Sequence, residues 1–127
     1  MNNKFVLVDT SAWIEMLRPP SVSAVAKRVK DLLMEGRAAL CEIILLELWH
    51  GANGKYERAA LSEMQRVLTC FKINSLVWTR SWQLAQRAKQ SGLTCPTTDL
   101  VIAACAFEND LTIEHNDKHL SLLSKFR

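Results

Sequence analysis

An unbroken apolar run near the start of the chain, FVLV at residues 5–8, constrains the fold more than any other feature. A strand with one face in water alternates apolar and polar residues, so a continuous apolar run predicts a strand that is covered on both faces. Such strands are typical of parallel sheets, in which helices connect successive strands and cover both sides. A fold of this kind requires helical segments between its further strands.

The rest of the chain supplies this alternation. Short apolar segments at residues 38–42, 71–76 and 111–117 predict further strands. Segments with helical spacing of apolar residues lie at residues 22–36, 43–54, 57–70, 77–93, 99–110 and 118–126. Strands that alternate with helices predict an α/β fold with a mainly parallel central sheet flanked by helices. A length of 127 residues suits one domain, so we expect residues 1–127 to form a single one.

Composition and simple motifs exclude several classes of protein. No apolar run approaches the roughly 20 residues that a membrane-spanning helix needs. The N-terminal sequence MNNKFVLVD lacks the layout of an export signal, which predicts a cytoplasmic protein. The four cysteines contain no C-x-x-C pair, so we expect reduced thiols, packed in the core at Cys41 and Cys105. A formal net charge of +3 permits a nucleic-acid partner without requiring one.

Four carboxylates occupy positions where a charge is unexpected. Asp9 directly follows the first apolar strand, and Asp117 follows the strand segment LTIEHN. Glu47 is the only charged residue in the apolar stretch IILLELW, and Asp99 begins the apolar helix DLVIAACAF. Each has a structural explanation when taken alone, because Asp is a favoured helix N-cap and a buried Glu can form a salt bridge.

Taken together, these carboxylates predict a metal site. Carboxyl ends of strands and starts of helices meet at the same rim of an α/β sheet. Carboxylates that converge there repel one another unless protons or cations relieve the repulsion. A set of oxygen ligands favours Mg²⁺ or Mn²⁺. Ser11, two residues after Asp9, could add a hydroxyl group or orient a bound water molecule.

The three histidines are candidate general acids in such a site. His50 stands near the end of a predicted helix, and His119 stands on the last predicted helix, so we expect structural roles for both. His115 lies two residues before Asp117, and its role stays open between packing and participation in the site.

The ordered set of acidic residues resembles that of the PIN-domain nucleases, and most closely the small VapC-type toxins of toxin–antitoxin pairs. The matching segments are VDTSAWIE, ELWHG, TTDLVIAACA and HNDKHL, which together span nearly the whole chain. The resemblance implies that Asp9, Glu47, Asp99 and Asp117 form an acidic metal-binding quartet in a single α/β/α sandwich. In this chain His115 stands where Thr or Ser often precedes the last Asp, although no acidic residue of the quartet is missing.

The resemblance also implies an activity and partners. The expected protein is an Mg²⁺- or Mn²⁺-dependent endoribonuclease that hydrolyses RNA, forms a homodimer and is the toxin partner of a cognate antitoxin. Two alternatives remain: a housekeeping RNA-processing nuclease without an antitoxin, and a PIN-like module that binds without cutting. A phosphatase of the haloacid dehalogenase type is disfavoured, because it needs a second Asp where this chain has Ser11. The absence of glycine-rich phosphate-binding motifs disfavours nucleotide cofactors.

Overall fold

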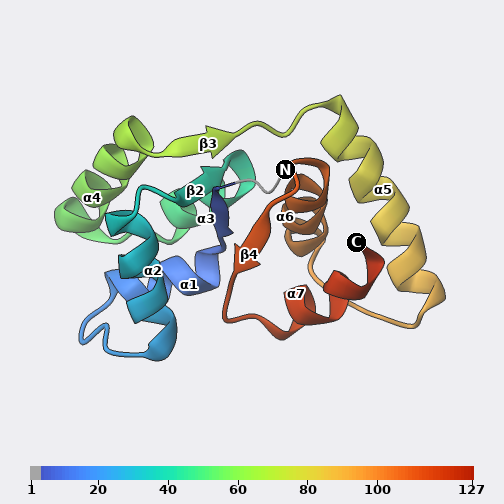
Figure 1. Cartoon of the computed structure of the whole chain (residues 1–127), viewed down its shortest axis with the longest axis horizontal. Helices are drawn as coiled ribbons and strands as arrows, with labels where there is room; N and C mark the ends of the chain where they lie inside the picture. Colours follow the sequence, from blue (N-terminus) through green and yellow to red (C-terminus); the bar gives the residue numbers. More distant parts are fainter. Residues whose placement is uncertain (1–3) are drawn as a thin grey trace.

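Four parallel strands form the central sheet of the computed structural model, which describes residues 4–127 (Figure 1). The sheet has the order β3-β2-β1-β4, and all three neighbouring pairs are parallel. The strands are β1 Val6–Val8, β2 Ala38–Cys41, β3 Thr69–Phe71 and β4 Thr112–Glu114. The parallel sheet expected from the first apolar run is therefore confirmed. Residues 1–3, where the segment examined for an export signal begins, lie outside the described residues.

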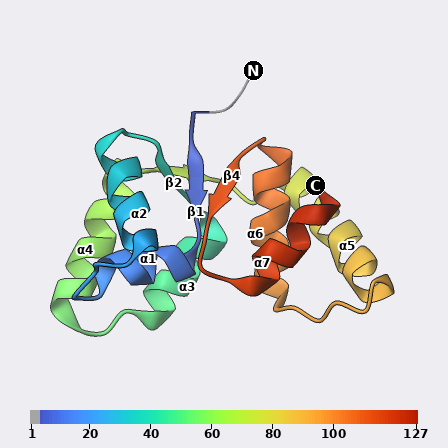
Figure 2. The ribbon, with the colours of Figure 1, turned by 60° about the horizontal axis from the view of Figure 1, so that its bottom comes forward.

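Helices connect the strands and cover the sheet, which gives one α/β/α sandwich domain. Figure 2 shows α1, α2 and α4 on one side of the adjacent strands β1 and β4, and α5, α6 and α7 on the other. Within residues 4–127, no helix is long and apolar enough to span a membrane. The helices are α1 Thr10–Leu17, α2 Ala24–Met34, α3 Glu42–Gly51, α4 Gly54–Val67, α5 Ser75–Gln90, α6 Thr97–Glu108 and α7 Lys118–Leu123, followed by a 3₁₀ turn at Ser124–Phe126.

The third strand lies earlier in the chain than its sequence pattern predicts. It covers residues 69–71 instead of 71–76, and the preceding helix ends at Val67 instead of continuing to residue 70. Pairing with β2 decides the position of this strand, because Cys70 lies opposite Leu40 in the sheet. The residues after the strand form the start of α5, where the Asn74 side chain accepts a hydrogen bond of 3.0 Å from the Val77 N–H.

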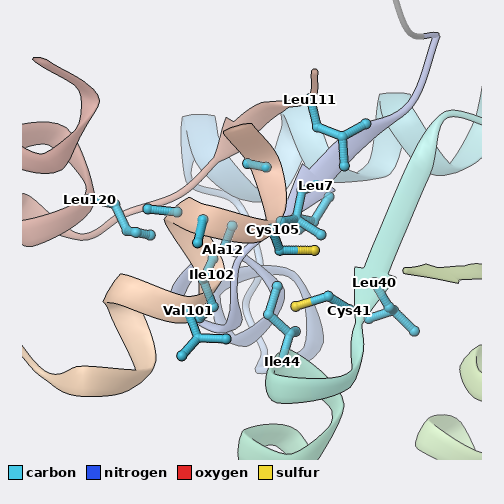
Figure 3. Packing of buried hydrophobic residues seen from close by; sticks show 14 of the residues in the cluster. Leu7, Ala12, Leu40, Cys41, Ile44, Val101, Ile102, Cys105, Leu111 and Leu120 are labelled. Atoms are coloured by element: carbon cyan, nitrogen blue, oxygen red, sulfur yellow. The ribbon is translucent and has the colours of Figure 1, made fainter. Parts of the chain in front are cut away.

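The core lies around α6 and the strands β1 and β2. Figure 3 shows side chains from β1, β2, α3 and α6 meeting there, among them Leu7, Ile44 and Ile102, which have no exposed surface. Helix α6 is buried from residue 99 to residue 106, as its apolar sequence predicts. All four cysteines are free thiols, with Cys41 and Cys105 buried in this core as expected.

Helix α3 differs from its sequence-based prediction. Its apolar sequence predicts burial on every side, but Leu46 is 64% exposed and Glu47 is half-buried. One side of α3 packs on the core through Ile44, and the opposite side is open to water. Glu47 therefore reaches a site that solvent and ions can enter.

This asymmetry of α3 gives a test of the fold. Ile44→Ala should lower the free energy of unfolding by about 2–5 kcal/mol, because it removes buried methyl groups and leaves a cavity. Leu46→Ala, on the exposed side of the same helix, should change it by less than about 0.5 kcal/mol. Urea denaturation measures both values. Equal effects at the two positions would contradict the orientation of α3 described here.

Candidate active site

Asp9 sits at the tip of β1, where it extends the sheet and begins a helix. Its N–H donates to the Glu114 carbonyl at 2.9 Å, which continues the pairing with β4 by one residue. Its side chain is the N-cap of α1, because Oδ2 accepts from the Ser11 N–H at 3.1 Å and from the Ser11 hydroxyl at 2.6 Å. Asp9 is only 3% exposed. The helix cap therefore fixes a buried carboxylate at the carboxyl end of the first strand.

Ser11 joins two distant segments at this rim. Besides donating to Asp9, its hydroxyl oxygen accepts from the Asn116 N–H at 2.8 Å, a residue 105 positions away in sequence. Both hydrogen bonds of this hydroxyl are with protein groups of the described residues. Ser11 thus holds the loop after β4 against the loop after β1.

Asp117 follows β4, and hydrogen bonds fix both its side chain and its main chain. It is the N-cap of α7, and its Oδ1 accepts from the N–H groups of His119 at 2.7 Å and Leu120 at 3.3 Å. The Asp117 N–H donates to Nδ1 of His115 at 3.2 Å. His115, whose role the sequence left open, therefore supports the main chain at Asp117.

Asp99 approaches the same rim from the start of α6. It is the third residue of that helix, whose N-cap is Pro96, so capping of the helix does not explain Asp99. Asp99 is 5% exposed, and within the described residues its Oδ2 has no hydrogen-bond partner. A buried carboxylate oxygen without a partner is costly, so it indicates a ligand that completes the site.

Glu47 completes the set from α3. The Thr10 hydroxyl donates to its Oε1 at 2.7 Å, so the residue directly after Asp9 orients this carboxylate. The sequence pattern did not indicate a role for Thr10 in the site. Its only signal was a hydroxyl group next to Asp9.

The four carboxylates influence one another electrostatically. Burial, which is the largest cause, and the negative charges of Asp117, Asp9 and Glu47 together raise the pKa of Asp99 to about 7. Burial and the charges of Asp99 and Asp117 also raise the pKa of the Cys95 thiol. Cys95 is therefore a poor nucleophile at neutral pH, which agrees with the lack of an adjacent base in the sequence.

His119 is a site residue that sequence analysis placed among the structural ones. Its Nδ1 lies 3.4 Å from Oδ1 of Asp117 and 3.7 Å from Oδ2 of Asp99. The ligand atoms of these three residues all lie within 4.8 Å of one another. Within residues 4–127, Asp9 and Glu47 do not belong to this tight group. The sequence signal for His119 was its position two residues after Asp117, at the start of a helix.

The donor atoms at this rim fit a divalent cation. Carboxylate oxygens predominate, which suits Mg²⁺ and Mn²⁺, and the buried Oδ2 of Asp99 has no hydrogen-bond partner within residues 4–127. A cation would also relieve the repulsion that raises the pKa of Asp99.

The raised pKa of Asp99 gives a stability prediction for metal-free protein. Its pKa in the folded state lies above the unfolded value of 3.8, so ionisation disfavours the fold as pH rises from about 4 to about 7. Asp99→Asn should therefore raise the free energy of unfolding at pH 7.5 by up to about 4 kcal/mol and leave it nearly unchanged at pH 4. Urea denaturation in EDTA at both pH values measures this difference.

The matched control is Asp31→Asn, which removes an exposed carboxylate on α2. It should leave the pH dependence of wild type intact. If Asp99→Asn and Asp31→Asn behave alike, Asp99 does not carry the electrostatic strain assigned to it.

Known proteins match this chain over nearly its whole length. The family model described as PIN domain matches residues 6–125. Ribonuclease VapC11 of Mycobacterium tuberculosis is 29% identical over 124 residues, which cover 94% of this chain and 92% of the relative. The VapC ribonuclease Mb1587 of Mycobacterium bovis shows the same identity and coverage.

Solved structures share the fold at lower identity. FitAcB from Neisseria gonorrhoeae has a TM-score of 0.75 and 24% identity, and covers 95% of this chain and 94% of its own. VapC20 of Mycobacterium tuberculosis, described as a sarcin-ricin loop cleaving toxin, has a TM-score of 0.73 and 17% identity, with coverage of 92% and 93%. These structures have the same fold as this chain. Because the family model spans nearly all of the described residues, the chain belongs to the PIN domain family.

Proposed function

We propose that this chain is a metal-dependent endoribonuclease that hydrolyses RNA phosphodiester bonds in the cytoplasm as the toxin of a type II toxin–antitoxin pair. The observation that carries the proposal is the convergence of buried carboxylates on one rim, where Oδ2 of Asp99 has no hydrogen-bond partner within the described residues. The relatives support the substrate class, because VapC11 is named a ribonuclease and VapC20 is described as a toxin that cleaves the sarcin-ricin loop.

The acidic quartet would hold Mg²⁺ or Mn²⁺. We assign Asp99 and Asp117 as direct ligands because their oxygens lie close together, and Asp9 and Glu47 complete the acidic set from β1 and α3. When bound, the ion supplies an activated water molecule and stabilises negative charge on the phosphate in the transition state. The protein would therefore need no covalent nucleophile of its own.

The surrounding side chains of the site have positioning roles in this mechanism. Ser11 fixes the Asp9 carboxylate through its 2.6 Å hydrogen bond, and Thr10 fixes Glu47 through its 2.7 Å bond. His115 accepts from the Asp117 N–H and so holds the last carboxylate in place. Without a cation, this dense negative charge would repel the phosphates of RNA, so substrate binding and metal binding should depend on each other.

Metal dependence is the first test of this function. Purified chain, freed of antitoxin, should cut single-stranded or loop RNA in the presence of Mg²⁺ or Mn²⁺ and stop when EDTA is added. Asp9→Asn should lower the cleavage rate at least about 100-fold, because the substitution removes a charge from the acidic set while keeping the shape of the side chain. Gel analysis of a labelled RNA reports the rate.

Asp31→Asn serves as the control, since this carboxylate is exposed and lies on α2. Its cleavage rate should match that of wild type. Cleavage that continues undiminished after chelation would overturn the proposed mechanism, and a folded wild-type chain that binds RNA without cutting it would favour the binding-module alternative.

A pocket beside Glu47 is a candidate site for the antitoxin. It has a volume of about 180 Å³ and lies between α1, α3 and α4. Its apolar lining suits an apolar segment of a partner, which could then direct a guanidinium group toward the carboxylates. The lining includes the apolar residues Ile14, Leu17, Leu48, Ala60 and Leu61 together with Thr10 and Glu47.

We assign contact between two copies of the chain to a different surface. Helix α5 exposes the apolar side chains of Leu76, Trp78 and Trp82. An exposed group of large apolar side chains is typical of a surface that contacts another protein. Sedimentation of the purified protein tests the homodimer that the family resemblance implies.

Expression in cells tests the toxin function. The chain expressed alone should arrest growth, because it degrades RNA, and co-expression of the small neighbouring gene should restore growth. The Asp9→Asn form should be harmless alone, because it lacks activity but keeps the fold. Colony counts after induction measure the effect. If the wild-type chain is harmless and binds no product of the adjacent gene, the housekeeping-nuclease alternative replaces the toxin.

A further inference from the structure

His119 lies between two carboxylates at distances that do not suit hydrogen bonds. Its Nδ1 is 3.4 Å from Oδ1 of Asp117 and 3.7 Å from Oδ2 of Asp99. An N–H···O hydrogen bond in a protein spans about 2.7–3.2 Å. The imidazole is therefore directed at both carboxylates without bonding to either of them.

The same distances suit ligands that share one ion. With metal–ligand bonds of about 2.1 Å, adjacent ligands of an octahedron lie about 3.0 Å apart and opposite ligands about 4.2 Å apart. The two distances from His119 fall between these values, and all three ligand atoms lie within 4.8 Å of one another. Small movements of the side chains would bring the three atoms onto one ion.

Burial adds an independent reason to place an ion here. Asp99 is 5% exposed, and its Oδ2, the oxygen that faces His119, has no hydrogen-bond partner within the described residues. Oδ1 of Asp117 already accepts two backbone N–H groups, which fix its direction. The backbone N–H of His119 is one of these donors, so the imidazole and the Asp117 carboxylate are held together at the start of α7.

We propose that His119 is a metal ligand together with Asp99 and Asp117, and that its nitrogen shifts the preference of the site from Mg²⁺ toward transition-metal ions such as Mn²⁺. This inference rests on the proposed metal dependence and specifies its chemistry. Mg²⁺ takes oxygen ligands and keeps several water molecules, whereas imidazole is a ligand for first-row transition metals. A site of two carboxylates and one imidazole therefore differs more in its affinities for Mn²⁺ and Mg²⁺ than a site of four carboxylates would.

Electron spin echo spectroscopy of bound Mn²⁺ tests this ligand directly, without measuring activity. The probe is Mn²⁺ added to the tag-free chain, and the signal is the modulation caused by a directly coordinated imidazole nitrogen. Protein labelled with ¹⁵N only at histidine should show the ¹⁵N pattern in place of the ¹⁴N pattern. The chain contains three histidines, so single substitutions assign the signal.

His119→Phe should abolish the histidine coupling while Mn²⁺ still binds through the carboxylates. His50→Phe is the control, because His50 is exposed at the end of α3 and is outside the group of Asp99, Asp117 and His119. It should keep the coupling. In titrations with each ion, His119→Phe should lower the affinity for Mn²⁺ at least about tenfold and change the affinity for Mg²⁺ by less than about threefold.

The possible outcomes separate this inference from the proposed function. Mn²⁺ bound to the wild-type chain without histidine coupling would overturn the role of His119 and leave the carboxylate site standing. Coupling that survives in His119→Phe would overturn it as well. If Mn²⁺ and Mg²⁺ both fail to bind the folded wild-type chain, the metal-dependent function fails together with this inference.

Discussion

The parallel pairing of β1 with β4 is the constraint on which the rest of the site depends. It places the end of the first strand next to the end of the last one, and the hydrogen bond from the Asp9 N–H to the Glu114 carbonyl extends this contact beyond the strands. Ser11 then joins the two loops that follow. Carboxylates from the two ends of the chain thereby meet on one rim, as ligand-binding groups do in parallel α/β sheets.

Repulsion among the carboxylates at this rim lowers the stability of the fold, and packing in the core holds the carboxylates in place. Burial and neighbouring charges raise the pKa of Asp99, which means that its ionised form is disfavoured in the folded protein. The main chain at Asp99 is held in place, because α6 is buried from residue 99 to residue 106 and packs on α5 and β4. The apolar residues that follow Asp99 thus hold a charged group in an unfavourable position, which is typical of functional sites.

The sequence predicted the parallel α/β fold and selected the four carboxylates, because both depend on local pattern. The run at residues 5–8 required burial on both faces, and Asp9 interrupted it. The sequence pattern placed the start of β3 too late in the chain. Pairing with β2 sets the register of this strand, and a local pattern does not contain this information. Thr10 and His119 were not selected because their contacts are with Glu47 and Asp99, which are distant in sequence. Leu46 was expected inside because an apolar sequence does not tell which side of α3 faces water.

The pocket beside α1 shares two side chains with the acidic rim. Thr10 and Glu47 line it, and the hydrogen bond between them is the one that orients Glu47. Any occupant that forms a hydrogen bond with Thr10 or Glu47 changes the free energy of cation binding at the rim. Thermodynamic linkage is reciprocal, so the cation must change the affinity for that occupant by the same factor. The concentration of free divalent ions would then set the affinity of the pocket for its occupant. Cation binding and occupant binding could not be adjusted separately.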